Sequence, residues 1–365
     1  MMSKVLIIGG SFAGLTAARE LCQDFQVTLV DLKEYYEYTP GILRAMVDPN
    51  AYPSISVKYA DISQSMGFDF IKGEVIELSS HSAEIQNAQG IVMTTFDYCI
   101  IACGTDYYDP IKPHRTYEDL SNERHETIIE THDEIEEAQS IMILGAGIVG
   151  VELAGELVSK FHDKNITLYS AQDVIMPGMP KLAQKYAENF LTEKGVKIVY
   201  NKKASEEEFK DFDLVFKCIG VIYNTKFLQK NFQENLNDRG KIVVNDFLQV
   251  KEHIFAAGDV AQTTLNLAGT AYAAEQMGKL LAKNIRAIAS GSRLREMGTL
   301  PMLYCVSLGP EFGVTVYQNL VIPGSCQAFV KFFIQYTKVK ELENPMFNLM
   351  WKGLDFAAEA LSHFF

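Results

Sequence analysis

Near the start of the chain, a glycine-rich turn is followed by a carboxylate about 20 residues later. Glycines let a backbone turn tightly and approach a pyrophosphate, whose charge rests on the N–H groups at a helix start. The carboxylate can accept hydrogen bonds from ribose hydroxyls. These residues predict dinucleotide binding, and they are Gly9, Gly10, Ser11, Phe12, Ala13, Gly14 and Asp31. Ser11 departs from the usual middle glycine, but it is small and its hydroxyl could donate to a phosphate.

The flanking segments have the composition that such a turn requires. Residues 5–8 are apolar and predict a buried strand, residues 15–21 predict a helix, and residues 27–30 predict a second strand. Strand, turn, helix and strand in this order form the unit that binds dinucleotides. A purely structural βαβ turn is the alternative, and it is disfavoured because Asp31 ends the second strand.

The same pattern recurs in the middle of the chain. Gly145, Gly147 and Gly150 complete a GxGxxG motif, between a predicted strand at 141–144 and a predicted helix at 151–161. Two such units indicate two dinucleotides, and the simplest pair is a tightly held flavin with a diffusing nicotinamide. The next strand ends in Ser170 and therefore lacks the carboxylate that would exclude the 2′-phosphate of NADPH. The sequence thus leaves both NADH and NADPH as possible nicotinamides.

Glu152 follows this second motif and has two interpretations. At the expected helix start, a carboxylate is stabilised by the helix dipole alone. Alternatively, it lies between nicotinamide and flavin and holds the nicotinamide. We favour the second interpretation, because the start of this helix faces the cofactor crevice in such units.

Three further strands end in glycine and could bring backbone groups to a cofactor. They deliver Gly104 after 98–102, Gly220 at the end of 213–220, and Gly258 with Asp259 inside 253–260. Gly220 would close the nicotinamide unit. Asp259 could bind the ribityl hydroxyls of a flavin while nearby N–H groups meet the pyrophosphate.

These elements predict an α/β fold with two Rossmann-like dinucleotide-binding domains, one for FAD and one for NAD(P). We expect a first FAD-binding part at 1–108, an NAD(P)-binding domain at 109–244, and a second FAD-binding part at 245–300. A small antiparallel meander is expected over 68–78, 83–85 and 90–95. Residues 301–365 are expected to form a C-terminal α+β segment that ends in an amphipathic helix.

Composition and cysteine placement narrow the function. A net charge of −13 without a basic stripe argues against nucleic acid and against electrostatic docking on an anionic membrane. The six cysteines form no CxxC pair, and no CxxxxC follows Asp31, so disulfide-reductase chemistry and a metal site are not expected. With no room for a signal peptide before Lys4 and no apolar run of membrane-spanning length, we expect a cytoplasmic protein or one peripheral on a membrane surface, not a secreted one.

Taken together, the motifs resemble those of the ferroptosis suppressor and apoptosis-inducing-factor-like flavoproteins and, more distantly, the type II NADH dehydrogenase-like members of the pyridine nucleotide-disulfide oxidoreductase superfamily. The resemblance rests on GGSFAGLTAARE, GAGIVGVELAGEL, IFAAGDVA and the terminal Trp351-Lys352. It implies that FAD contacts residues 10–14, Asp31, Arg44, Val75 and Asp259. It also implies that nicotinamide lies over residues 145–150, with Glu152 and Lys352 near the flavin.

The predicted function is an FAD-dependent NAD(P)H oxidoreductase that passes electrons to a quinone-like acceptor. Lys352 would stabilise the reduced flavin or supply a proton to a quinone. Two alternatives stay open: a non-catalytic flavoprotein subunit or signalling protein, and a reductase of a non-quinone acceptor. The apolar stripe at 345–365 could pack on its own domain, on a second copy as a homodimer, or on a membrane surface.

Overall fold

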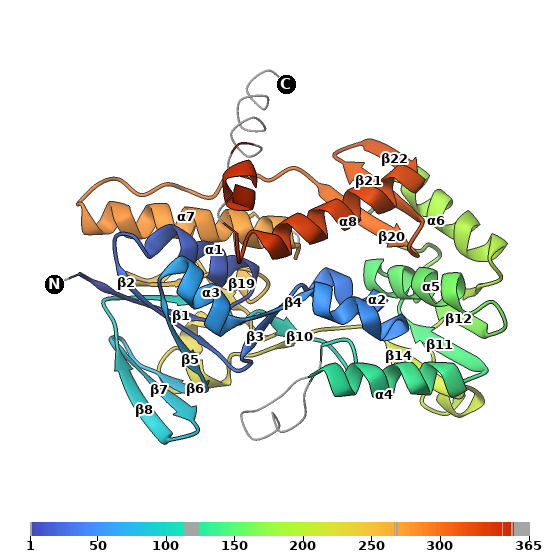
Figure 1. The fold of residues 1–365 in the computed structure, drawn as a ribbon, viewed down its shortest axis with the longest axis horizontal. Helices are drawn as coiled ribbons and strands as arrows, with labels where there is room; N and C mark the ends of the chain where they lie inside the picture. The colour runs from blue at the N-terminus through green and yellow to red at the C-terminus, as the bar shows by residue number, and fades with distance from the viewer. Residues whose placement is uncertain are drawn as a thin grey trace.

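The computed structural model describes residues 2–112, 124–265, 267, 269–344, 346–351 and 353. Two mainly parallel sheets lie side by side with helices packed against them, and an antiparallel sheet with a long helix lies across the second of them (Figure 1). This is the mixed α/β architecture that the strand and helix patterns predict.

The first sheet has six strands in the order β17-β18-β9-β1-β2-β5. Every neighbouring pair is parallel except β17 with β18. The strands are β1 (Lys4–Ile8), β2 (Gln26–Asp31), β5 (Asp69–Lys72), β9 (Tyr98–Ile101), β17 (Gln249–Lys251) and β18 (Ile254–Ala256). Ile7 and Ile100 are fully buried, as expected for central strands that are covered on both faces.

Helices α1 (Phe12–Leu21) and α7 (Ala271–Ala289) pack against each other beside this sheet (Figure 1). Their backbones approach closely at Gly278, where a Cβ would lie 2.5 Å from the carbonyl oxygen of Ala13. Thr270 caps α7 by accepting a hydrogen bond from the Ala273 N–H at 3.1 Å. Residues 249–289 therefore add two strands to the first sheet and a helix that packs on α1.

The predicted meander is present, but it is shorter than expected. It consists of β6 (Glu74–Leu78), β7 (Ser82–Asn87) and β8 (Gly90–Thr95), all antiparallel. The expectation that 68–78 is one strand of it is wrong, because the chain turns at Gly73 and β5 joins the parallel sheet beside β2. A Cβ on Gly73 would lie 2.7 Å from Ile85, so only glycine fits this turn.

Short elements connect β2 to β5. Strand β3 (Tyr35–Glu37) pairs antiparallel with β4 (Ser56–Lys58), and helix α2 (Ile42–Val47) lies between them in the chain. Helix α3 (Tyr59–Met66) then leads to β5. Arg44, which the resemblance places near FAD, lies on α2.

The second sheet is parallel throughout, in the order β13-β12-β11-β14. Its elements are α4 (Arg124–Glu137), β11 (Ser140–Leu144), α5 (Ile148–Lys160), β12 (Asn165–Tyr169), α6 (Lys181–Glu193), β13 (Lys197–Val199) and β14 (Leu214–Lys217). The expected helix start at 151 is wrong, because α5 begins at Ile148 with Gly147 as its N-cap.

Two chain segments cross between the sheets. Strand β10 (Thr105–Asp106), which follows the first sheet, pairs antiparallel with β15 (Ile222–Tyr223), which follows the second. The Asn224 amide donates to Asp106 at 2.8 Å beside this pair. Strands β16 (Ile242–Val243) and β19 (Ala261–Gln262) pair nearby in the returning chain.

The C-terminal part contains three antiparallel strands and a helix. These are β20 (Leu303–Leu308), β21 (Phe312–Tyr317), β22 (Leu320–Gly324) and α8 (Ser325–Lys340). Residues 346–351 are helical, whereas Leu354, Leu361 and Phe365 of the predicted apolar stripe lie outside the described residues. None of the helices in the described ranges combines the length and apolar character needed to cross a membrane.

Candidate active site

The two glycine turns have the same construction. A Cβ on Gly9 would lie 2.4 Å from the carbonyl oxygen of Ala102, and one on Gly145 would lie 2.6 Å from that of Cys218. Both glycines have positive φ, +100° and +110°. Each therefore lies against the end of the neighbouring parallel strand, β9 in the first sheet and β14 in the second.

The last glycine of each turn repeats the match. A Cβ on Gly14 would lie 1.9 Å from the Gly9 carbonyl oxygen, and one on Gly150 would lie 1.9 Å from that of Gly145. Helices α1 and α5 thus approach their strands as closely as the dinucleotide fingerprint requires. Neither position accepts any other residue.

The middle positions of the two turns differ from these tightly packed glycines. A Cβ on Gly147 would meet no protein atom within 4 Å, so this position borders open space at the start of α5. Ser11 holds the matching place before α1, and its side chain makes no capping hydrogen bond. The N–H groups at the start of α5 therefore border open space, and a helix start of this kind suits a pyrophosphate.

Asp31 lies at the tip of β2 beside the first cradle. Its Oδ2 accepts a hydrogen bond from the Gly10 N–H at 2.7 Å, and its Oδ1 accepts one from the Lys33 N–H at 2.9 Å. A carboxylate has about four lone-pair sites, so it can still accept from ribose hydroxyls. The Tyr59 hydroxyl donates a hydrogen bond to the Gly10 carbonyl oxygen at 2.6 Å and so stabilises the glycine turn.

The other predicted binding residues lie at the carboxyl ends of strands. Gly104 and Gly220 follow β9 and β14 with φ of +66° and +68°, so the two sheets match here too. Gly258 follows β18, and its N–H donates to the Met277 sulfur at 3.2 Å. Burial raises the pKa of Tyr107, which follows β10, and the nearby charge of Asp259 raises it further.

Val75 lies apart from this edge, on β6. It is buried and pairs with Ile85 of β7, next to a register irregularity in β6. Its contact with FAD stays a prediction from the resemblance.

Tyr38 marks the junction between the two units. Its ring packs edge-on against Phe12 of the first turn, with ring centroids 5.6 Å apart. Its pKa is raised above the ordinary value by burial and by the charges of Glu275, Cys305 and Glu152. Glu152 of the second unit and Cys305 of β20 therefore lie near enough to affect the ionisation of Tyr38.

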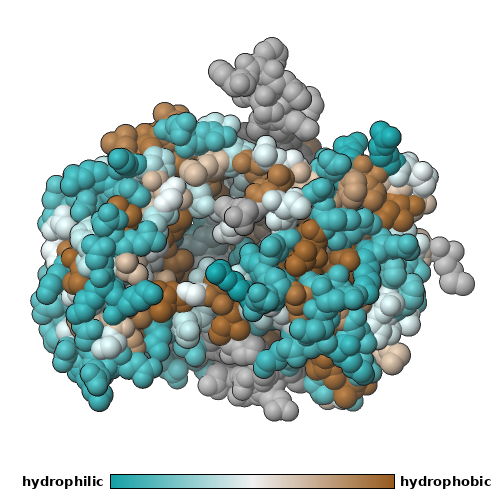
Figure 2. Space-filling view, turned by 180° about the vertical axis from the view of Figure 1, so that it is seen from behind, coloured by the Kyte–Doolittle hydropathy of each residue, from teal (hydrophilic) through white to brown (hydrophobic). Residues whose placement is uncertain are grey.

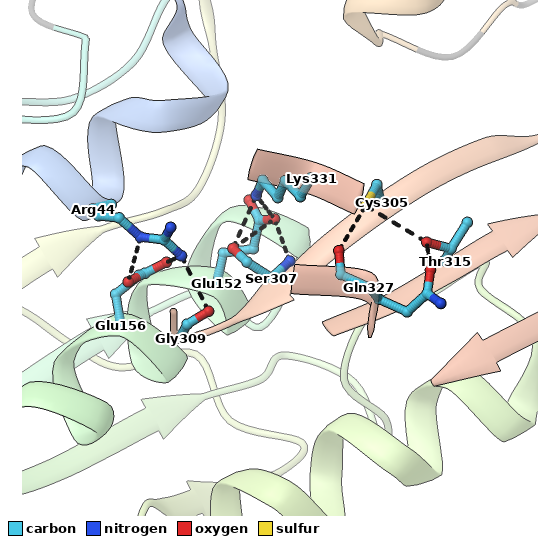
Figure 3. Close-up of polar contacts among 9 residues, drawn as sticks. All are labelled: Arg44, Glu152, Glu156, Cys305, Ser307, Gly309, Thr315, Gln327 and Lys331. Atoms are coloured by element: carbon cyan, nitrogen blue, oxygen red, sulfur yellow. Dashed lines mark hydrogen bonds and ion pairs between the residues drawn. The ribbon is translucent and has the colours of Figure 1, made fainter. Parts of the chain in front are cut away.

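Glu152 is buried at this junction, in the second turn of α5 (Figure 3). The helix-capping interpretation is wrong, because the first turn of α5 contains no acidic residue. Its Oε1 accepts hydrogen bonds from the Ser307 N–H at 2.9 Å and from the Lys331 ammonium at 2.5 Å. Lys331 also donates to the Ser307 hydroxyl at 2.9 Å.

Arg44 of α2 pairs with Glu156, which follows Glu152 by one turn of α5. Its guanidinium donates to both carboxylate oxygens of Glu156, at 2.8 Å and 3.2 Å, and to the Gly309 carbonyl oxygen at 3.1 Å (Figure 3). Arg44 thus has partners within the protein, and its contact with FAD stays a prediction.

A second buried carboxylate is held by the same C-terminal helix. Lys338, two turns after Lys331 on α8, donates to Glu275 of α7 at 2.9 Å. Burial raises the pKa of Glu275, while the Lys338 ammonium acts in the opposite direction. Sequence reasoning missed Lys331, Lys338 and α8 altogether.

All six cysteines lie within the described residues and are free thiols. Cys103 and Cys218 follow the ends of β9 and β14, and burial raises the pKa of each to about 12. Thiols held in the protonated form are poor nucleophiles. In the described ranges, no three histidine, cysteine or acidic side chains gather where a metal ion could bind. Lys352 lies outside the described residues.

The face of the molecule opposite to that in Figure 1 is hollowed near its centre (Figure 2).

Two matched glycine cradles at the carboxyl ends of parallel strands define a protein that binds two dinucleotides. The sequence profile of the family described as pyridine nucleotide-disulphide oxidoreductase matches residues 3–278. The chain therefore belongs to this family, which confirms the predicted redox enzyme with FAD and NAD(P)H as its cofactors.

Individual proteins agree with this placement. The chain is 26% identical to ferroptosis suppressor protein 1 of Xenopus tropicalis, over 93% of each chain. It is 24% identical to the type II NADH:quinone oxidoreductase of Staphylococcus saprophyticus, over 93% of this chain and 96% of that one. Among solved structures, the sulfide:quinone oxidoreductase of Aquifex aeolicus superposes with a TM-score of 0.78 at 16% identity, over 94% of this chain and 92% of that chain. The resemblance read from the motifs is confirmed.

Proposed function

We propose that this chain oxidises NAD(P)H through FAD and delivers the electrons to a quinone-like acceptor. The observation that carries the proposal is the repetition of one glycine cradle in two units, which the ion pair between Arg44 and Glu156 joins. The similarity to a type II NADH:quinone oxidoreductase supports a quinone as the acceptor. The buried, protonated thiols support chemistry that runs without a dithiol.

The proposed division follows the sheets. The first sheet with residues 1–108 and 245–300 binds FAD, and the second sheet with residues 109–244 binds NAD(P)H. Bound there, the nicotinamide would supply a hydride to the flavin, and the two electrons and one proton of this hydride, with a second proton from solvent, would convert a quinone to its hydroquinone. The chain's own part is to bind both groups, orient them and exclude water from the junction.

Named residues carry these roles. Asp31 and Asp259 bind ribose and ribityl hydroxyls, while the N–H groups after Gly9 and Gly145 bind the two pyrophosphates. Glu152 holds the nicotinamide. Lys352 acts on the acceptor side, where a cation stabilises reduced flavin or passes a proton to the quinone. We expect Lys352→Ala to slow reoxidation by quinone and to leave reduction by NADH unchanged. Equal loss in both half-reactions would contradict this role.

An acceptor panel tests the proposed function. The purified protein, with NADH in excess, is offered a short-chain ubiquinone, an iron–sulfur carrier protein and monodehydroascorbate in parallel. We expect NADH oxidation to depend on the quinone. Preference for either of the other acceptors would identify a non-quinone reductase, and no turnover with any of them would favour a non-catalytic flavoprotein.

We further propose that the outer face of α8 contacts a membrane surface, where quinones dissolve. Exposed aromatic side chains cover it, with Phe329 and Phe332 exposed by 68% and 53%, followed by Phe333 and Tyr336. Aromatic rings suit the membrane–water interface. Flotation with phosphatidylcholine vesicles tests this: we expect binding that Phe329→Ser weakens. Protein that stays unbound but elutes as a dimer would assign the face to a second copy.

A further inference from the structure

Glu152 presents its two carboxylate oxygens to different surroundings. Every hydrogen bond that Glu152 accepts from the described residues goes to Oε1, from the Ser307 N–H, the Ser307 hydroxyl and Lys331. Its Oε2 accepts none of them, and it is not among the fully enclosed polar atoms that lack a partner. One oxygen is therefore fixed by the protein while the other can accept a hydrogen bond from a ligand.

The partners of Oε1 come from the C-terminal part of the chain. Ser307 is on β20 and Lys331 is on α8, whereas Glu152 is on α5 of the second unit. Both partners lie beyond residue 278, where the family match ends. The second dinucleotide unit is thus incomplete at this carboxylate until the C-terminal strands and helix pack against it.

Burial makes these contacts of Glu152 costly to lose. The Glu152 and Lys331 side chains are exposed by only 10% and 14%, and Ser307 is buried. A buried carboxylate that lost its cation would take up a proton or move toward water, because an unpaired charge is costly at such a position. In either case its ability to accept a hydrogen bond would change.

We propose that Lys331 and Ser307 are positioning residues that fix Glu152, so that Oε2 accepts a hydrogen bond from the carboxamide N–H of the nicotinamide. The carboxamide is the hydrogen-bond donor on that ring, and a charged acceptor binds it more strongly than a neutral one. The proposal rests on the proposed function only for the identity of this ligand. It assigns the C-terminal segment a direct part in nicotinamide binding.

Titration calorimetry of the flavin-loaded protein with NAD+ tests the proposal without turnover. We expect Lys331→Met to weaken binding by roughly tenfold or more, since small displacements of a positioned group have large effects. Lys331→Arg should restore most of the affinity because it keeps the cation. Ser307→Ala should have a smaller effect, because the backbone N–H still donates. The control is Lys340→Met, whose lysine lies on the same helix but pairs with Glu343 at the surface, and it should match the unaltered protein.

The flavin content of each variant separates positioning from stability. An unchanged flavin content with weakened NAD+ binding supports the proposal. Unaltered NAD+ affinity in both Lys331→Met and Ser307→Ala would overturn it, and so would loss of flavin in proportion to loss of NAD+ binding. If Lys331→Met does not fold, Ser307→Ala alone decides between these outcomes.

The two levels of inference can fail separately. If the unaltered protein binds NAD+ and NADH bleaches its flavin, unchanged affinity in the variants removes only the roles of Lys331 and Ser307. If it binds NAD+ through Lys331 but NADH leaves its flavin oxidised, the proposed function fails and the positioning roles stand. If it binds no NAD+, both fail.

Discussion

Arg44 and Glu156 form a two-pronged ion pair between residues 112 positions apart in the chain. Arg44 belongs to α2, which follows the first glycine unit, and Glu156 belongs to α5 of the second. The same guanidinium also bonds the Gly309 carbonyl oxygen in the turn between β20 and β21. This one side chain therefore joins three segments that surround the proposed junction of flavin and nicotinamide.

Replacing Arg44 by methionine should lower stability by about 1–2 kcal/mol, because the pair is bidentate but Arg44 is 30% exposed. The denaturant midpoint of the apoprotein measures this. Lys72→Met is the control, since Lys72 and Glu34 form an exposed pair and should contribute little. An unchanged midpoint together with lost FAD would show instead that Arg44 acts on the flavin.

Gly147 offers a separate test of the second cradle. Its Cβ position is open, so Gly147→Leu should fold and retain FAD while the new side chain fills the place of the pyrophosphate. We expect NAD+ binding, measured by calorimetry, to be lost. Gly150→Ala is the contrasting variant, because its Cβ would lie 1.9 Å from a carbonyl oxygen and should disrupt folding. Tight NAD+ binding by Gly147→Leu would place the nucleotide elsewhere.

Glu152→Gln preserves the size of the side chain but removes its charge. We expect anaerobic reduction of the flavin by NADH to slow by roughly 10- to 100-fold, with little change in FAD retention. Stopped-flow absorbance measures the reduction. Glu137→Gln, on the exposed face of α4, should reduce at the rate of the unaltered protein. Reduction kinetics that do not change in Glu152→Gln would remove Glu152 from the site.

Lys338→Met should make stability depend more strongly on pH. Burial raises the pKa of Glu275 and Lys338 opposes it, so removing the ammonium raises this pKa further. A carboxyl group whose pKa is raised by folding stabilises the protein at low pH, and this stability is lost as pH rises through the folded-state pKa. Thermal unfolding should therefore show a larger loss at pH 8 than at pH 5. An equal loss at both pH values, or a similar loss in Lys340→Met, would contradict this reasoning.

The nucleotide units could be predicted because their signals are local. Glycine spacing, apolar strands and Asp31 occur within one stretch of chain, and strand-end glycines such as Gly104 and Gly220 follow the same rule. Two details were wrong within this frame. Helix α5 begins at Ile148, three residues before the predicted start, and Gly150 lies within its first turn. Strand β5 belongs to the parallel sheet and not to the meander, because the chain turns at Gly73.

The C-terminal contribution could not be predicted, because its signals are weak. Helix α8 begins after Gly324 without a side-chain cap, and aromatic residues fall on its exposed face. Strand β22 contains Pro323, which disfavours a strand except at an edge, and the structure places it at the edge of its sheet. The contact of Lys331 with Glu152 spans 179 positions and follows only from tertiary packing.

The central claim is that this chain moves electrons from NAD(P)H through FAD to a quinone. An anaerobic visible spectrum of the purified protein tests it most directly, taken first alone, then after NADH, then after a short-chain ubiquinone. The account predicts an oxidised flavin spectrum that bleaches with NADH and recovers with the quinone. A flavin that never bleaches, or a protein without flavin, would contradict it.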